Sequence, residues 1–165
     1  MVLRWAKIVL VAAIAFLTTL VAFNNLTDYG SNYQFVRHVL MMDTTFPGNH
    51  GLWRAIDSPV IHTLFYLTII AWEIAICLLL WWGAVRMLRA AGGSAREFER
   101  AKTIAFAGLT LSLLMWLVAF LAVGGEWFLM WQSPAWNGQS AAAREFLVSG
   151  IVLLFLQQRE REPDL

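Results

Sequence analysis

Residues 60–85 form a long apolar run that carries a single carboxylate, Glu73, near its middle. A bilayer core is crossed by roughly 20 apolar residues of helix, so this run is long enough to span a membrane. A carboxylate at such a depth costs on the order of 2.5–3.5 kcal/mol, and it therefore needs a proton, a partner or a function. We expect an integral membrane protein with a polar group built into its interior.

The composition agrees with a membrane protein. Hydrophobic residues make up 59% of the chain and charged residues 14%, whereas soluble domains have about 25% charged residues. The length of 165 residues predicts one domain, residues 1–165. A net charge of +1 argues against nucleic acid as a partner, because nucleic acid requires a concentrated basic face.

Four stretches are apolar enough to span a membrane: residues 5–23, 60–85, 103–124 and 140–157. We therefore predict an all-α fold, a four-transmembrane-helix bundle. The fourth stretch has the shortest apolar part, so Arg144 and Glu145 should lie at the membrane boundary. A cleaved signal peptide is the alternative for the first stretch, but its apolar part is longer than the usual core of about 7–15 residues.

Basic residues predict the orientation. Nine lysines and arginines fall on the side of the termini, and only Arg37, Arg54 and Arg144 fall on the other. By the positive-inside rule, both termini should be cytoplasmic and residues 24–58 and 125–139 should face outward. In the inner loop, residues 86–102, Glu97 and Glu99 dilute the basic charge, which favours a solvated connector over a lipid-binding patch.

The first outer segment, residues 24–58, is too long for a simple connection. Ser31 and Gln34 have capping-box spacing, which predicts a short amphipathic helix over residues 32–43. Asp43 falls at the carboxyl end of this helix, where a negative charge opposes the helix dipole. We expect Asp43 to pair with Arg54 or Arg144, and Arg54 is the first choice.

Aromatic and charged residues gather on the outer side. Trp127 and Trp131 would share a helical face if the third span continued that far. An aromatic belt at the lipid interface explains such tryptophans without a function. Their charged neighbours favour an outer-face cluster, closed by ion pairs from Asp43 and Glu126 to the two outer arginines. Its members are Asp43, Trp53, Arg54, Glu126, Trp127, Trp131 and Arg144.

His62, Tyr66 and Glu73 share one face of the second span, because eleven residues are almost three helical turns. His62 and Glu73 are roughly 16 Å apart along the axis, so they do not pair directly. One interpretation is a proton or ion path. The other is a neutral Glu73 that packs against a hydroxyl on a neighbouring helix. In the first interpretation, Thr18, Thr19, Thr110 and Ser112 on neighbouring helices help to line the path.

Histidine and methionine residues on the outer side, His38, His50, His62, Met41 and Met42, are suitable ligands for copper or haem. They lack the close spacing of a ligand set, so we expect no metal site and no cofactor. Nucleophile elbows, zinc-protease motifs and phosphate loops are also missing from the sequence, and we expect no enzymatic activity.

The segments NNLTDYGSNYQFVRHVLMMDTTFP, SPVIHTLFY, WWGAVRMLRA and GGEWFLMWQSPAWNG resemble a bacterial family of predicted small integral membrane proteins, domain of unknown function 2165. The resemblance runs almost end to end and implies a four-span protein of the inner (plasma) membrane. It implies no mechanism and no functional residues.

The sequence thus favours an accessory, assembly or scaffolding subunit that acts through its outer, periplasmic face. Its expected partners are the lipid bilayer and another membrane or periplasmic protein. One alternative is a proton or ion relay, or a small-solute transporter, that uses His62, Tyr66 and Glu73. A further alternative is a redox carrier that binds haem or a quinone.

Overall fold

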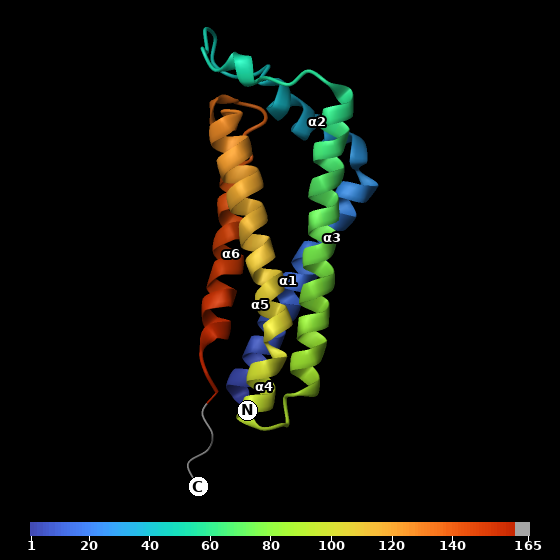
Figure 1. Ribbon diagram of the computed structural model, residues 1–165, viewed down its shortest axis with the longest axis vertical. Coiled ribbons are helices and arrows are strands. Elements are labelled where there is room, and N and C mark those ends of the chain that lie inside the picture. The colour runs from blue at the N-terminus through green and yellow to red at the C-terminus, as the bar shows by residue number, and fades with distance from the viewer. Residues whose placement is uncertain (161–165) are drawn as a thin grey trace.

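The computed structural model describes residues 1–160, and within them the regular structure is entirely helical. Four helical rods are long and apolar enough to cross a membrane (Figure 1). They are α1 (Val2–Thr27), α3 (Pro59–Arg89), the rod formed by α4 (Ala95–Ala101), α5 (Thr103–Leu114) and η2 (Met115–Trp127), and α6 (Gln139–Gln157). The prediction of four helices that are long and apolar enough to span a membrane is confirmed. Arg161, one of the nine basic residues counted on the terminal side, lies outside the described residues.

The N-terminus and the last described residue, Glu160, lie at one end of the bundle, which we call the terminal end (Figure 1). The opposite end carries α2 (Tyr29–Met41) and the segment between α2 and α3, which includes η1 (Leu52–Arg54). We call it the α2 end. The first two spans extend beyond the predicted limits because helical hydrogen bonding continues past the apolar core. In particular, α1 reaches Thr27 and therefore includes Asn25.

Local signals explain where the helices begin. Pro59 opens α3, where its missing N–H costs nothing. Ser94 caps α4 in a capping box with Glu97, and these hydrogen bonds from the Ser94 backbone and side chain lower the pKa of Glu97. The capping box predicted at Ser31 is wrong. The cap residue of α2 is Asp28, whose backbone oxygen accepts a hydrogen bond from Asn32.

The third rod changes from an α-helix to a π-helix at Met115. A π-helix of this length is unusual, since most are single turns within an α-helix. It ends at Trp127, and Leu129 then takes a left-handed conformation, with φ at 53°, before the short helix η3 (Met130–Gln132). Trp127 and Trp131 are therefore on different elements, and the predicted shared helical face is wrong.

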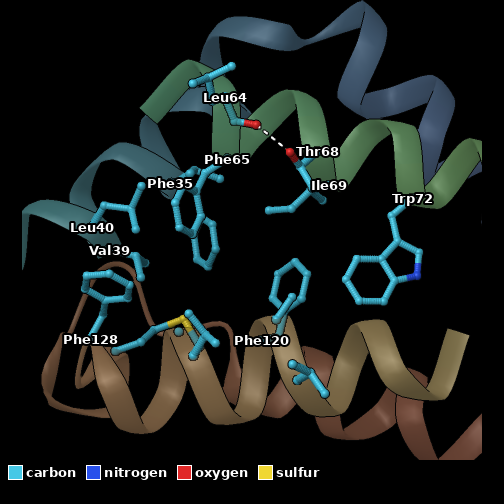
Figure 2. A pocket seen from close by; sticks show the side chains of 16 residues that line it. Phe35, Val39, Leu40, Leu64, Phe65, Thr68, Ile69, Trp72, Phe120 and Phe128 are labelled. Carbon is cyan, nitrogen blue, oxygen red and sulfur yellow. Dashed lines mark hydrogen bonds between the residues drawn. The ribbon is translucent and has the colours of Figure 1, made fainter. Parts of the chain in front are cut away.

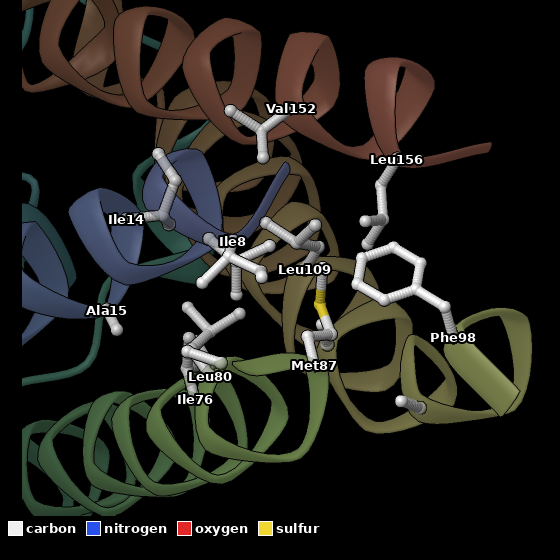
Figure 3. Packing of buried hydrophobic residues seen from close by; sticks show 14 of the residues in the cluster. Ile8, Ile14, Ala15, Ile76, Leu80, Met87, Phe98, Leu109, Val152 and Leu156 are labelled. Carbon is white, nitrogen blue, oxygen red and sulfur yellow. The ribbon is translucent and has the colours of Figure 1, made fainter. Parts of the chain in front are cut away.

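The main core lies in the terminal half of the bundle, where all four rods contribute apolar side chains (Figure 3). Ile8, Ile76, Leu80 and Leu109 are among its buried members. Gly83 lies at a close approach of α3 and α5, since a Cβ there would lie 2.7 Å from the backbone nitrogen of Ala105. Close packing at small residues is a main source of helix association in lipid.

Buried basic side chains hold the end of α6 at the terminal end. The Lys102 ammonium donates to the Leu156 carbonyl at 2.8 Å, and the Lys7 ammonium donates to the Glu160 carboxylate at 2.7 Å. Cations at the carboxyl end of a helix satisfy its free carbonyls and complement its dipole. Burial of the Glu160 carboxyl raises its pKa, but the hydrogen bonds and charges of Lys7 and Arg4 outweigh burial, and the pKa is lowered overall.

Candidate functional site

Glu73 is buried on α3, with 1% of its surface exposed. Its carboxyl oxygens contact the side-chain nitrogen of Asn25 at 2.8 Å and 2.7 Å. The predicted partner, a hydroxyl group, is therefore wrong. Asn25 becomes available because α1 continues beyond the apolar run and brings this amide against the middle of α3.

Tyr66 also meets Asn25. Its hydroxyl donates to the Asn25 backbone oxygen at 2.8 Å, and its ring packs edge-on against Tyr29 at 4.8 Å between centroids. Tyr66 and Glu73 thus hold the backbone and the side chain of one residue on α1. These contacts tie α1 to α3 at the centre of the bundle.

His62 does not join this group. Its Nε2 donates to the Ile56 carbonyl at 2.8 Å, while the Ile56 N–H donates to the Leu40 carbonyl. Nδ1 of His62 is buried and has no hydrogen-bond partner within residues 1–160. His62 therefore fastens the segment before α3 to the bundle, and among residues 1–160 no hydrogen-bonded path joins it to Glu73.

A small polar void lies beside Glu73, with a volume of about 10 Å³. This is close to the minimum that can hold one water molecule. Every rod of the bundle supplies a polar lining residue: Thr18, Glu73, Ser112, Glu145 and Ser149. The Ser112 and Ser149 hydroxyls are hydrogen-bonded at 3.0 Å.

Glu145 was expected at the membrane boundary with Arg144, but the two side chains differ strongly in exposure, although they approach each other to 3.9 Å. Arg144 is 70% exposed, whereas Glu145 is 17% exposed and lines the polar void. Sequence reasoning missed Glu145 and Asn25 as members of this site. In both cases the signal was a polar residue within a turn or two of the end of an apolar run.

The predicted ion pair between Asp43 and Arg54 is wrong. Asp43 instead lies 2.7 Å from Nδ1 of His38, because Met42 takes a left-handed conformation that ends α2 and turns the chain. The Arg54 guanidinium lies over the rings of Trp53 and Trp127, at 5.8 Å and 5.4 Å from their centroids. Arg54 is thus held by aromatic rings.

The remaining members of the predicted outer-face cluster are dispersed. Trp131 packs edge-on against Phe46 at 5.7 Å between centroids. Glu126 is exposed and forms no ion pair within residues 1–160. Within residues 1–160, Arg144 forms an ion pair only with its neighbour Glu145, at 3.9 Å. The predicted closure of the α2 end by ion pairs is therefore wrong.

Neutral contacts join the two connecting segments at the α2 end. The Thr44 and Ser133 hydroxyls are 2.7 Å apart. The side-chain oxygen of Gln132 accepts hydrogen bonds from the Phe46 N–H and the Asn49 amide. These neutral bonds, together with the aromatic pairs, take the place of the predicted ion pairs.

A larger, apolar pocket of about 450 Å³ lies between α2, α3 and η2 (Figure 2). Five of its sixteen lining residues are aromatic, among them Phe35, Phe65, Trp72 and Phe120, and most of the others are aliphatic. Its one hydroxyl, on Thr68, already donates to the Leu64 carbonyl. None of the three histidines lines the pocket, which is suited to apolar groups only.

The four rods and the polar site between them define a multi-pass helical membrane protein. The chain belongs to the family described as predicted small integral membrane protein (DUF2165), whose family model matches residues 3–159. The family resemblance of the sequence is thereby confirmed. Comparisons with curated proteins and with solved structures give no match. No three His, Cys, Asp or Glu side chains of residues 1–160 are grouped closely enough to hold a metal ion.

Proposed function

We propose that this protein is a non-enzymatic accessory or assembly subunit of the inner membrane, which binds another membrane or periplasmic protein through its α2 end. In this proposal both termini are cytoplasmic and the α2 end is periplasmic. The excess of basic residues on the terminal side supports that orientation.

The observation that carries the proposal is an exposed aromatic surface around Arg54 at the α2 end. We call it the outer aromatic surface, and its members are Trp53, Arg54 and Trp127. A separate exposed pair at the same end is Phe46 with Trp131. Trp53 is 76% exposed although its ring packs against Trp127 at 5.8 Å. Tryptophan and arginine are the residues most enriched where protein interfaces gain their binding energy.

Membrane-belt tryptophans are the alternative explanation for this surface. Belt residues sit at the level of the lipid headgroups, on the spans themselves. Trp53 and Phe46 belong to the segment between α2 and α3, which rises past the end of η2 and α6 (Figure 1). This position favours contact with a protein over contact with lipid.

Site-specific photo-crosslinking in living cells tests the proposal. A photoreactive phenylalanine analogue at position 53 should give a discrete adduct with one protein, and Arg54→Ala should weaken it. The matched control is the same analogue at position 82, because Trp82 is 55% exposed and lies in the half of α3 that is nearer to the terminal end. The absence of an adduct at position 53, or the same adducts at both positions, would refute the assignment.

The orientation has its own test. Single cysteines at Asn49 and Asn137, in a Cys77→Ser background, should react with an impermeant thiol reagent when only the outer membrane is opened. Protection of both cysteines would show that the α2 end faces the cytoplasm.

A second candidate function is a proton-linked or cation-linked step at the polar void. The specific observation is that two carboxyl groups from different rods, Glu73 and Glu145, line one water-sized space with three hydroxyl groups. Ionisable residues within a membrane commonly mark ion or proton pathways. In proteoliposomes, Glu73→Gln should abolish a proton flux that the wild type supports. Equal flux in wild type, variant and empty liposomes would eliminate this candidate.

A further inference from the structure

Three arginines surround a hollow at the terminal end. Arg86 and Arg89 come from the last turns of α3, and Arg100 comes from α4. The hollow has a volume of about 510 Å³, and small residues, Ala90, Gly93 and Ala101, form much of its remaining lining. None of the three arginines forms an ion pair within residues 1–160.

The two acids that dilute this charge in the sequence have other partners in the fold. Glu99 accepts hydrogen bonds from the Lys102 ammonium and from the Glu160 N–H, both at 2.8 Å. Glu97 lines the hollow, but one of its oxygens is held by the N–H and hydroxyl of Ser94 in the capping box. Three guanidinium groups therefore face a single carboxylate.

The surface of α3 leads from the membrane directly to this hollow. Leu78, Trp82, Val85, Arg86 and Arg89 follow helical spacing along one face, and all five are exposed. Leu78 is 65% exposed and Trp82 is 55% exposed. The face thus changes along α3 from apolar and aromatic side chains to basic ones, which is the order in which a phospholipid presents its acyl chains and its headgroup.

We propose that this hollow binds the phosphate group of an anionic phospholipid, with the acyl chains along Leu78, Trp82 and Val85. Arginine matches phosphate oxygens with paired N–H donors, and basic pockets beside transmembrane helices recognise lipid headgroups. The site is separate from the outer aromatic surface, because it lies at the opposite end of the bundle. A free phosphate compound has the same recognition chemistry, so the test includes it.

The test uses the full chain, purified in a neutral detergent and titrated with phosphatidylglycerol or phosphatidylcholine while bound lipid is counted by native mass spectrometry. Wild type should prefer phosphatidylglycerol. Arg86→Gln, Arg89→Gln and Arg100→Gln should each weaken that binding about fivefold. The matched control is Arg96→Gln, an exposed arginine of α4 outside the hollow, which should bind like wild type.

Three outcomes would overturn the proposal. Equal affinity of the wild type for the two lipids would remove the headgroup preference. An equal loss of phosphatidylglycerol affinity in Arg96→Gln would show that the lipid is attracted to basic charge in general and not to the hollow. Displacement of the lipid by inorganic phosphate at equal concentration would assign the hollow to a free anion. Thermal unfolding of each variant checks the fold, and because the substituted side chains are exposed, we expect midpoints close to that of the wild type.

Discussion

Replacing Asn25 by alanine should destabilise the bundle by about 2 kcal/mol. The change removes both contacts to the Glu73 carboxyl, at 2.8 Å and 2.7 Å. Leaving a buried polar group without a partner costs about 1–3 kcal/mol, and a hydrogen bond between helices in a membrane contributes about 0.6 kcal/mol on average. The Tyr66 hydrogen bond should survive, since its acceptor is the Asn25 backbone oxygen.

Unfolding by sodium dodecyl sulfate in mixed micelles, followed by tryptophan fluorescence, measures this loss. Asn24→Ala is the matched control. Asn24 is exposed on the same helix, and hydrogen bonds involve its backbone oxygen, which alanine retains. We expect Asn24→Ala to stay within about 0.5 kcal/mol of wild type.

A double-mutant cycle separates the Asn25–Glu73 interaction from general effects of each substitution. In a Glu73→Ala background, Asn25→Ala should cost much less, giving a coupling energy of about 1–2 kcal/mol. Losses that simply add would show that the two side chains do not interact. The assignment of Asn25 as the partner of Glu73 would then be wrong.

Three further predictions follow from the fold. The pKa of Glu160 is lower in the folded state than in the unfolded state, where it is about 4.3. The stability that Glu160 contributes is therefore complete above about pH 4.3 and is lost as the pH falls through its folded-state pKa. Glu160→Gln should reduce this fall in the unfolding midpoint, measured between about pH 5 and 3. Gly83→Ala should cost about 1–3 kcal/mol in thermal unfolding, because the new Cβ meets backbone atoms of α5, whereas Gly150→Ala, with its nearest neighbour at 3.6 Å, should be tolerated. Arg54→Ala and Asp43→Ala should be additive within about 0.5 kcal/mol, and a larger coupling would contradict their separate partners.

Helix positions were readable from the sequence because the signals are local. A helix in lipid satisfies its backbone groups within its own segment, so an apolar run of sufficient length is enough to indicate a span. The capping box of Ser94 and Glu97 is another local signal, because it marks the start of α4. The interpretation of the inner loop from the sequence did not use it. The helix bounds shifted by a few residues, and that small shift brought Asn25 into the site.

The partners of the polar residues were not readable, because they depend on how the rods cross. A hydroxyl group on a neighbouring helix was the expected partner of Glu73, and the path of α1 across α3 brought the Asn25 amide there instead. Asp43 found a basic partner only five residues away, in His38, once the left-handed Met42 turned the chain. Charge counting identifies which residues share a side, but it does not show which of them touch.

The sequence by itself determined a four-span helical membrane protein with a polar interior, because hydropathy, length and basic residues are properties of segments. Only the tertiary structure decided that Glu145 joins Glu73 at one void. It also decided that the Glu160 N–H holds Glu99 and that three arginines from α3 and α4 surround one hollow. The physical reason is that the interaction energy between two charges depends on the distance between them, and packing between the rods sets those distances.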